Sequence, residues 1–98
     1  MARVRSEDGI SLYAELAGEG PAVVFSCALN TTHENWREQV ETLVPRGYRV
    51  VLWDYRGHGR SDAPEDPDAY SMDRVVSDLG CVLDWAAPDE RAVLAGLS

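Results

Sequence analysis

Three short apolar segments, separated by two helical patterns, constrain the fold of this chain more than any other feature. Residues 22–27 are apolar almost throughout, and residues 48–53 and 91–95 form two further short apolar runs. Strands that are covered on both faces, as in the middle of a parallel sheet, have this composition. Because the segments between them have helical periodicity, we expect right-handed strand-helix-strand connections and an α/β fold with a mostly parallel sheet.

Both helical segments carry start and stop signals. Thr31 and Glu34 have the spacing of a capping box, and the apolar stripe that follows them ends before Gly47. Ser71 is the expected N-cap of the second helix. The apolar residues of that helix keep the spacings of three and four that define an amphipathic face: Met72, Val75, Val76, Leu79, Val82, Leu83 and Ala86.

The first part of the chain reads as a β-hairpin. Residues 2–6 and 10–16 both alternate between apolar and polar side chains, and Asp8-Gly9 stands between them. An Asp-Gly pair flanked by two alternating runs predicts a tight antiparallel turn. We therefore expect a hairpin at one edge of the sheet and one helix on each face.

The charge balance narrows the classes of partner. The 98 residues include seventeen acidic residues and nine arginines, which gives a formal net charge of −8. Binding to a phosphate backbone needs a basic patch, so we expect no nucleic-acid partner. The sequence shows no run of transmembrane length and no charged-then-apolar leader, so we expect a soluble, cytoplasmic protein without a membrane partner. Cys27 and Cys81 form no C-x-x-C unit, and we expect two buried small side chains and no metal site.

Three loops follow the three apolar strands, and they are expected to meet at one edge of the sheet. They comprise residues 28–30, 54–61 and 96–98. Ligands bind at the carboxyl ends of the strands in an open parallel sheet. Gly96-Leu97-Ser98 has the form of the first half of a G-x-S-x-G nucleophile elbow, in which a sharp turn presents a serine hydroxyl. Ser98 is the candidate nucleophile. The alternative interpretation is that Ser98 is an ordinary turn serine at the end of a strand.

Two stretches carry a resemblance to a known family. Residues 54–61, with the sequence DYRGHGRS, are similar to the D-x-R-G-x-G-x-S stretch that follows the fourth strand of α/β-hydrolase-fold enzymes. Residues 95–98, AGLS, are similar to the approach to the nucleophile of the same family. The resemblance covers nearly the whole chain and less than half of a complete enzyme. We therefore interpret residues 1–98 as the N-terminal portion of a single α/β-hydrolase domain, truncated at the nucleophile elbow, with a partial α/β-hydrolase fold.

The resemblance implies a serine hydrolase that acts on a small-molecule ester or lactone through an acyl-serine intermediate. It makes Ser98 the nucleophile and the backbone N–H of Leu29 one oxyanion-hole donor. Fixed amide dipoles of this kind stabilise the charge that develops on the carbonyl oxygen. A serine hydroxyl needs a histidine and an orienting acid to become a good nucleophile, and the family carries both beyond residue 98. No metal or organic cofactor is implied.

The loop after the first apolar strand narrows the resemblance. Residues 26–29, Ser-Cys-Ala-Leu, lack the His-Gly pair of many relatives and look like the corresponding loop of 3-oxoadipate enol-lactonases. The serine at residue 98 argues against epoxide hydrolases and haloalkane dehalogenases, whose nucleophile is a carboxylate. The alternatives within enzymes are a C–C bond hydrolase and a cofactor-free haloperoxidase-like member. The alternative outside enzymes is a non-catalytic remnant or partner-binding module of the same fold.

Other polar residues near the loops have structural interpretations. The family's catalytic base lies far downstream, so we expect His58 to shape its loop or the rim of the site. His33 is either a solvated first-turn residue or a residue that borders the pocket. Asp54 and Arg56 are interpreted as parts of a structural turn in which Asp54 accepts hydrogen bonds from loop amides. Core packing is the expected role of three tryptophans, Trp36, Trp53 and Trp85.

Two rival interpretations lead to different functions. A dinucleotide-binding loop at residues 57–59 would need a third glycine where Asp62 stands, and a helix that begins well before Ser71, so this interpretation is poor. The stronger rival is that residues 1–98 alone catalyse nothing, because the acid and the histidine are missing. If the family's strand order holds, the last strand lies beside the strand of residues 22–27 as an uncovered apolar edge, which favours aggregation.

Overall fold

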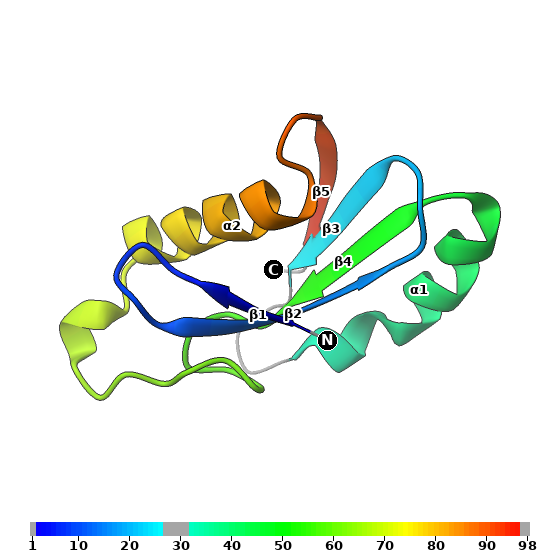
Figure 1. The fold of residues 1–98 in the computed structure, drawn as a ribbon. Coiled ribbons are helices and arrows are strands. Elements are labelled where there is room, and N and C mark those ends of the chain that lie inside the picture. The colour runs from blue at the N-terminus through cyan, green and yellow to red at the C-terminus, as the bar shows by residue number, and fades with distance from the viewer. Residues whose placement is uncertain (1, 27–31, 97–98) are drawn as a thin grey trace.

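A five-stranded sheet lies at the centre of the molecule (Figure 1). The computed structural model describes residues 2–26 and 32–96. The strands are β1 (Ala2–Arg5), β2 (Ser11–Ala17), β3 (Ala22–Ser26), β4 (Arg49–Trp53) and β5 (Ala92–Gly96). Their order across the sheet is β1-β2-β4-β3-β5. Strands β3, β4 and β5 are parallel, whereas β2 pairs antiparallel with both β1 and β4.

This topology confirms the predicted α/β fold with an N-terminal hairpin. The Asp8-Gly9 turn joins β1 to β2, and Gly9 has a φ of 92°, a left-handed conformation that glycine adopts without steric cost. The turn is closed by a hydrogen bond of 2.9 Å from the backbone N–H of Ser6 to the carbonyl of Ile10. The hairpin therefore occupies one edge of the sheet, as the alternating pattern predicts.

Helices cover both faces of the sheet (Figure 1). The longer ones are α1 (Arg37–Leu43) and α2 (Met72–Ala86), and three short 3-10 helices are η1 (His33–Trp36), η2 (Val44–Arg46) and η3 (Pro67–Ala69). Within the described ranges, no helix has the length and apolar character needed to cross a membrane.

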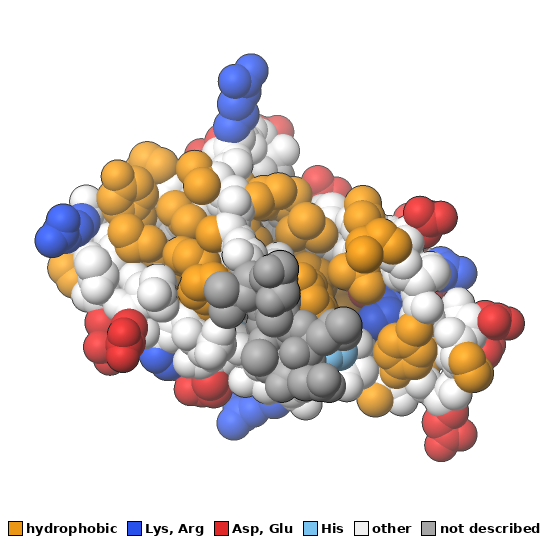
Figure 2. Space-filling view, turned by 180° about the vertical axis from the view of Figure 1, so that it is seen from behind, with side chains coloured by type: hydrophobic (Ala, Val, Ile, Leu, Met, Phe, Trp, Pro, Cys, Tyr) orange, Lys and Arg blue, Asp and Glu red, His pale blue; other side chains and the backbone are white. Residues whose placement is uncertain are grey.

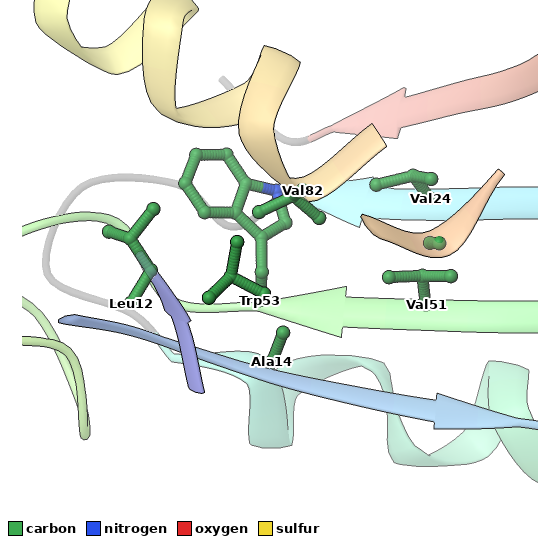
Figure 3. Packing of buried hydrophobic residues seen from close by; sticks show 8 residues of the cluster. Leu12, Ala14, Val24, Val51, Trp53 and Val82 are labelled. Carbon is green, nitrogen blue, oxygen red and sulfur yellow. The ribbon is translucent and has the colours of Figure 1, made fainter. Parts of the chain in front are cut away.

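Alternate residues of the central strands divide the core into two halves. Val24 and Val51 are register partners in β3 and β4, and both pack with Val82 of α2 (Figure 3). The intervening partners, Phe25 and Leu52, belong to the second cluster, which includes Trp36 and the apolar residues of α1 and η2. Because successive side chains of a strand point to opposite faces, each strand supplies both halves. One helix per face is thus confirmed.

The helix boundaries follow capping chemistry, with one difference from the sequence prediction. Ser71 caps α2 as predicted, and its hydroxyl accepts a hydrogen bond of 3.2 Å from the backbone N–H of Arg74. The N-cap of η1 is Thr32, whose hydroxyl accepts from the N–H of Glu34 at 3.3 Å. The predicted cap, Thr31, is one residue too early and lies outside the described residues. The hydroxyls of Thr32 and Ser71 thus accept hydrogen bonds from backbone N–H groups of the first turn, which have no partner within the helix.

The apolar face of α2 is wider than the surface that the sheet covers. Val82 and Ala86 are buried, whereas Met72 and Val76 of the same predicted apolar face are 75% and 59% exposed. Trp85, which was expected in the core, is 38% exposed. The α2 residues that pack in the core cluster with the strands are Val75, Leu79, Cys81, Val82, Leu83 and Ala86. Seen from behind, the molecule shows many hydrophobic side chains on its surface (Figure 2).

Strand β5 forms the edge of the sheet opposite the hairpin. Among the described residues it pairs with β3 alone, and Val93 and Leu94 are 63% and 55% exposed. The expected apolar edge beside the strand of residues 22–27 is therefore confirmed. A strand edge with unpaired amides and apolar side chains is a template for pairing with another chain.

We expect the substitution Val93→Lys to reduce self-association of the 98-residue chain, because a charge on an edge strand opposes edge-to-edge pairing. The free energy of unfolding should change by no more than about 0.5 kcal/mol, since the side chain is exposed. Analytical ultracentrifugation over a range of concentrations measures the first effect and chemical denaturation the second. Val76→Lys on α2 is the matched control. An equal effect of the control would show that added charge, and not the edge, is responsible.

Candidate functional site

The ends of β3, β4 and β5 lie side by side at one edge of the sheet. Ser26, the last residue of β3, is the register partner of both Trp53 in β4 and Gly96 in β5. The indole N–H of Trp53 donates a hydrogen bond of 2.8 Å to the Ser26 hydroxyl, which ties two of the three tips together. The predicted convergence of the strand ends is thus confirmed.

The two predicted catalytic residues follow these tips directly in the sequence. Ser98 comes two residues after Gly96, and Leu29 comes three residues after Ser26. Ser98, Leu29 and Cys27 lie outside the described residues. The roles assigned to them stay predictions, and the geometry of the rim is built from the residues on either side.

Asp54, the residue after β4, is the centre of this rim. It is fully buried, and its carboxylate accepts hydrogen bonds from the backbone N–H of His33 at 2.6 Å and of Arg60 at 3.0 Å. The ring Nδ1 of His33 lies 2.8 Å from the same carboxylate. Asp54 therefore bonds to loop amides, as the sequence predicts, and it ties the start of η1 to the loop after β4.

Gly59 makes the close approach of this loop to Asp54 possible. A Cβ atom at Gly59 would stand 2.2 Å from a carboxylate oxygen of Asp54, and the residue has a φ of +49°. Contacts below 3.0 Å require something to shift, and here the neighbour is a buried carboxylate. The second glycine of the D-x-R-G-x-G-x-S stretch is thus required by space as well as by backbone conformation.

Ser61, the last residue of the stretch, fastens the loop to the hairpin. Its hydroxyl donates to the carbonyl of Asp54 at 2.6 Å and accepts from the N–H of Tyr13 at 2.8 Å. Asp62 continues the connection, because its backbone N–H donates to the carbonyl of Ser11 and its carboxylate accepts from the N–H of Ser11. The loop after β4 is therefore a rigid part of the rim.

Arg56 makes a second buried anchor that the sequence analysis does not foresee. Its guanidinium is 1% exposed and forms two hydrogen bonds of 2.7 Å with the carboxylate of Asp78 in α2. It also bonds to the carboxylate of Asp8 at 2.9 and 3.0 Å and to the carbonyl of Ala69 at 2.7 Å. The hydrogen bonds from Arg56 hold the pKa of the Asp8 carboxyl well below its usual range. One side chain thus joins the hairpin turn, η3 and α2.

We expect Arg56→Met to lower the free energy of unfolding by about 3–5 kcal/mol, because it leaves the buried Asp78 carboxylate without its counter-ion. Urea denaturation monitored by tryptophan fluorescence measures this change. Arg74→Met is the matched control, since Arg74 is exposed and lies 3.7 Å from Asp8. A loss below about 1 kcal/mol for Arg56→Met, the range of exposed ion pairs, would contradict the assigned role.

His33 is buried at the rim, where it contacts carboxylates on both ring nitrogens. It is 3% exposed, its Nδ1 faces Asp54, and its Nε2 lies 3.1 Å from Glu15 and 3.0 Å from Glu34. Carboxylates accept hydrogen bonds and do not donate them, so both contacts are hydrogen bonds only when both ring nitrogens carry hydrogen. The ring of Tyr13 packs against the imidazole at a centroid distance of 4.7 Å. Of the two sequence interpretations, the solvated first-turn residue is wrong.

Arg37 completes this cluster from α1. Its guanidinium forms two hydrogen bonds of 2.8 Å with Glu15 and bonds of 2.8 and 3.2 Å with Glu34. The hydrogen bonds from Arg37 to Glu15, followed by the hydrogen bond from the Tyr13 hydroxyl, lower the pKa of Glu15 to about 2. Ligand atoms of Glu15, His33 and Glu34 lie within 4.8 Å of one another, a spacing that can hold a metal ion. A metal ion there would compete with Arg37, which already bonds to both carboxylates.

The lowered pKa of Glu15 gives a signed prediction for acid stability. The folded-state pKa is about 2 and the ordinary value is 4.5, so the ionised carboxylate stabilises the fold above pH 4.5. This contribution is lost as the pH falls through the folded-state pKa. We expect Glu15→Gln to remove about 1–3 kcal/mol of the decline in unfolding free energy between pH 5 and pH 2. Denaturation across this pH range measures it, with Glu65→Gln as an exposed control. An unchanged pH profile in Glu15→Gln would contradict the assignment.

His58 contacts its own loop, as the sequence analysis expects. Its Nδ1 lies 3.1 Å from the carbonyl of Arg56, and its ring packs edge-on against Tyr55. It borders a shallow, mainly apolar cavity of about 210 Å³ at the N-terminal end of α2. The other lining residues are Tyr55, Arg56, Tyr70, Ser71, Met72 and Val75.

Comparisons with known proteins agree with this geometry. The profile of the alpha/beta hydrolase fold matches residues 21–98. An epoxide hydrolase from Caballeronia sordidicola is 40% identical over 91% of the chain and 27% of its own length. The 3-oxoadipate enol-lactonase 1 of Acinetobacter baylyi is 37% identical over 97% of the chain and 35% of its own length. The structure of an esterase from Exiguobacterium antarcticum superposes with a TM-score of 0.91 at 30% identity, over 99% of this chain and 35% of the esterase.

Proposed function

The chain belongs to the α/β hydrolase-fold family, and on this premise we propose that it forms part of a serine hydrolase that cleaves an ester or lactone. The chain spans 27% of the Caballeronia relative and 35% of the Acinetobacter relative, so the proposal concerns the whole protein. The observation that carries it is the pairing of Ser26 with Gly96 at the rim. Neighbouring strands in a sheet lie about 4.8 Å apart, so the segments that lead to Leu29 and Ser98 start from adjacent points.

In the proposed reaction Ser98 attacks the carbonyl carbon of the substrate. The oxygen of Ser98 forms a bond to that carbon, and its proton passes to a histidine that the resemblance places beyond residue 98. The backbone N–H of Leu29 donates to the carbonyl oxygen as negative charge develops on it. The bond to the leaving alcohol then breaks, the alcohol takes the proton, and water hydrolyses the acyl-serine to release the acid.

Epoxide hydrolysis is the second candidate function, because relatives with 40% and 37% identity bear the name epoxide hydrolase. The chemistry at residue 98 favours an ester over an epoxide. A serine oxygen that opens an epoxide forms an ether, which water does not cleave readily. A carboxylate nucleophile forms an ester in the same step, and water can hydrolyse that ester. The serine therefore suits acyl transfer, and the enol-lactonase similarity is in line with it.

The test compares substrates and serine variants in the full gene product. We expect hydrolysis of a p-nitrophenyl ester or a γ-lactone, and a fall in kcat of about three orders of magnitude or more in Ser98→Ala. Ser77→Ala is the matched control, since Ser77 lies on the surface of α2 and its hydroxyl donates a hydrogen bond to Glu7. Styrene oxide is the competing substrate.

Two outcomes would contradict the proposal. Ester hydrolysis that persists in Ser98→Ala would show that another group is the nucleophile. Turnover of styrene oxide without turnover of either ester would favour the second candidate function.

A further inference from the structure

We propose that His33 is a positioning residue for the hydrolytic site and acts through its bonds to Asp54. The inference rests on the proposed function, because it assigns to a buried histidine a part in placing the groups at the rim. His33 itself contacts no reacting atom in this proposal.

His33 is held to the tip of β4 by two bonds to one carboxylate. The backbone N–H and the ring Nδ1 both reach Asp54, at 2.6 and 2.8 Å. A backbone bond alone fixes where the chain passes, whereas the second bond also fixes the direction of the side chain. Both partners are buried, with the side chain of His33 4% exposed and that of Asp54 fully buried. Hydrogen bonds to a charged group are strong, and water does not compete for these.

The second ring nitrogen of His33, Nε2, is also held by carboxylates. Nε2 contacts Glu15 and Glu34, and both of these carboxylates are held by Arg37. The ring also packs on Tyr13. Rotation of the imidazole would break contacts on three sides, so His33 links α1, β2 and the tip of β4 in one fixed arrangement.

This arrangement bears on catalysis because of where His33 stands in the chain. It is the first residue of η1, and the sequence that connects η1 to β3 contains Leu29, the proposed oxyanion donor. An oxyanion donor lowers the barrier only when it is placed before the charge develops. A misplacement of about 1 Å can cost up to roughly 100-fold in rate. Interactions that are stronger in the transition state change kcat more than KM.

Two substitutions separate the two sides of the ring. The amide nitrogen of asparagine reaches the place of Nδ1, so His33→Asn can still donate to Asp54. The amide of glutamine reaches the place of Nε2, so His33→Gln retains a contact with the glutamates and loses the side-chain bond to Asp54. We expect His33→Gln in the full gene product to lower kcat for a p-nitrophenyl ester tenfold or more at nearly unchanged KM. His33→Asn should stay within threefold of the wild type, and Ser77→Ala on α2 is the control variant.

Each outcome decides the proposal. Unchanged kcat in a folded His33→Gln overturns it, and so does an equal loss in both variants, which would indicate a structural role alone. If His33→Gln fails to fold, His33→Asn still decides, because a tenfold loss of kcat in a folded His33→Asn overturns the proposal. Ser98→Ala is measured beside them. Full activity in that variant refutes the proposed function, whereas its loss together with an unaffected His33→Gln refutes only the role of His33.

Discussion

The carboxylate of Asp54 is the group on which the geometry of the rim depends. A buried charge is costly unless hydrogen bonds replace the lost water, and three donors from two separate loops meet this requirement. The need to satisfy one carboxylate thus becomes a constraint on the start of η1 and on the loop after β4. Gly59 belongs to the same constraint, since any side chain at this residue would occupy the space of the carboxylate. Within residues 54–61, the loop therefore folds back on Asp54, because Arg60 and Ser61 both donate hydrogen bonds to it.

Two arginines connect elements next to the rim through ion pairs with carboxylates. Arg56 is buried and joins Asp8 and Asp78, so it fixes the hairpin turn against α2. Arg37 has a side chain that is 41% exposed, and it bonds to Glu15 and Glu34 on the side of the sheet that α1 covers. Removing a buried partner leaves an uncompensated charge, whereas water screens an exposed pair. Arg56 should therefore matter more for stability, and the cluster around Arg37 more for the placement of His33.

The sequence pattern predicts the fold well because the relevant signals are local. Apolar runs and an Asp-Gly pair indicate the strands and the hairpin, and Ser71 marks the start of α2. The contacts of the rim are not local: Asp54 is 21 residues from His33, and Arg56 is 48 residues from Asp8. No periodicity reports on such pairs, so His33 is ambiguous and the ion pairs of Arg56 are missed. The exposure of Met72 depends on how far α2 extends past the sheet, which is likewise a property of tertiary packing. Ser98 and Leu29 stay predictions from the family resemblance.

Amide hydrogen exchange at His33 and Arg60 tests the central role of Asp54 most directly. If one carboxylate holds both loops, both amides exchange slowly in the wild type. Asparagine offers one acceptor oxygen where the carboxylate offers two, so in Asp54→Asn at least one of the two amides should exchange tenfold faster or more. The amide of Ile10, which donates to Ser6 in the hairpin, serves as the internal reference. Fast exchange of both amides in the wild type, or an unchanged pattern in Asp54→Asn, would contradict this account of the rim.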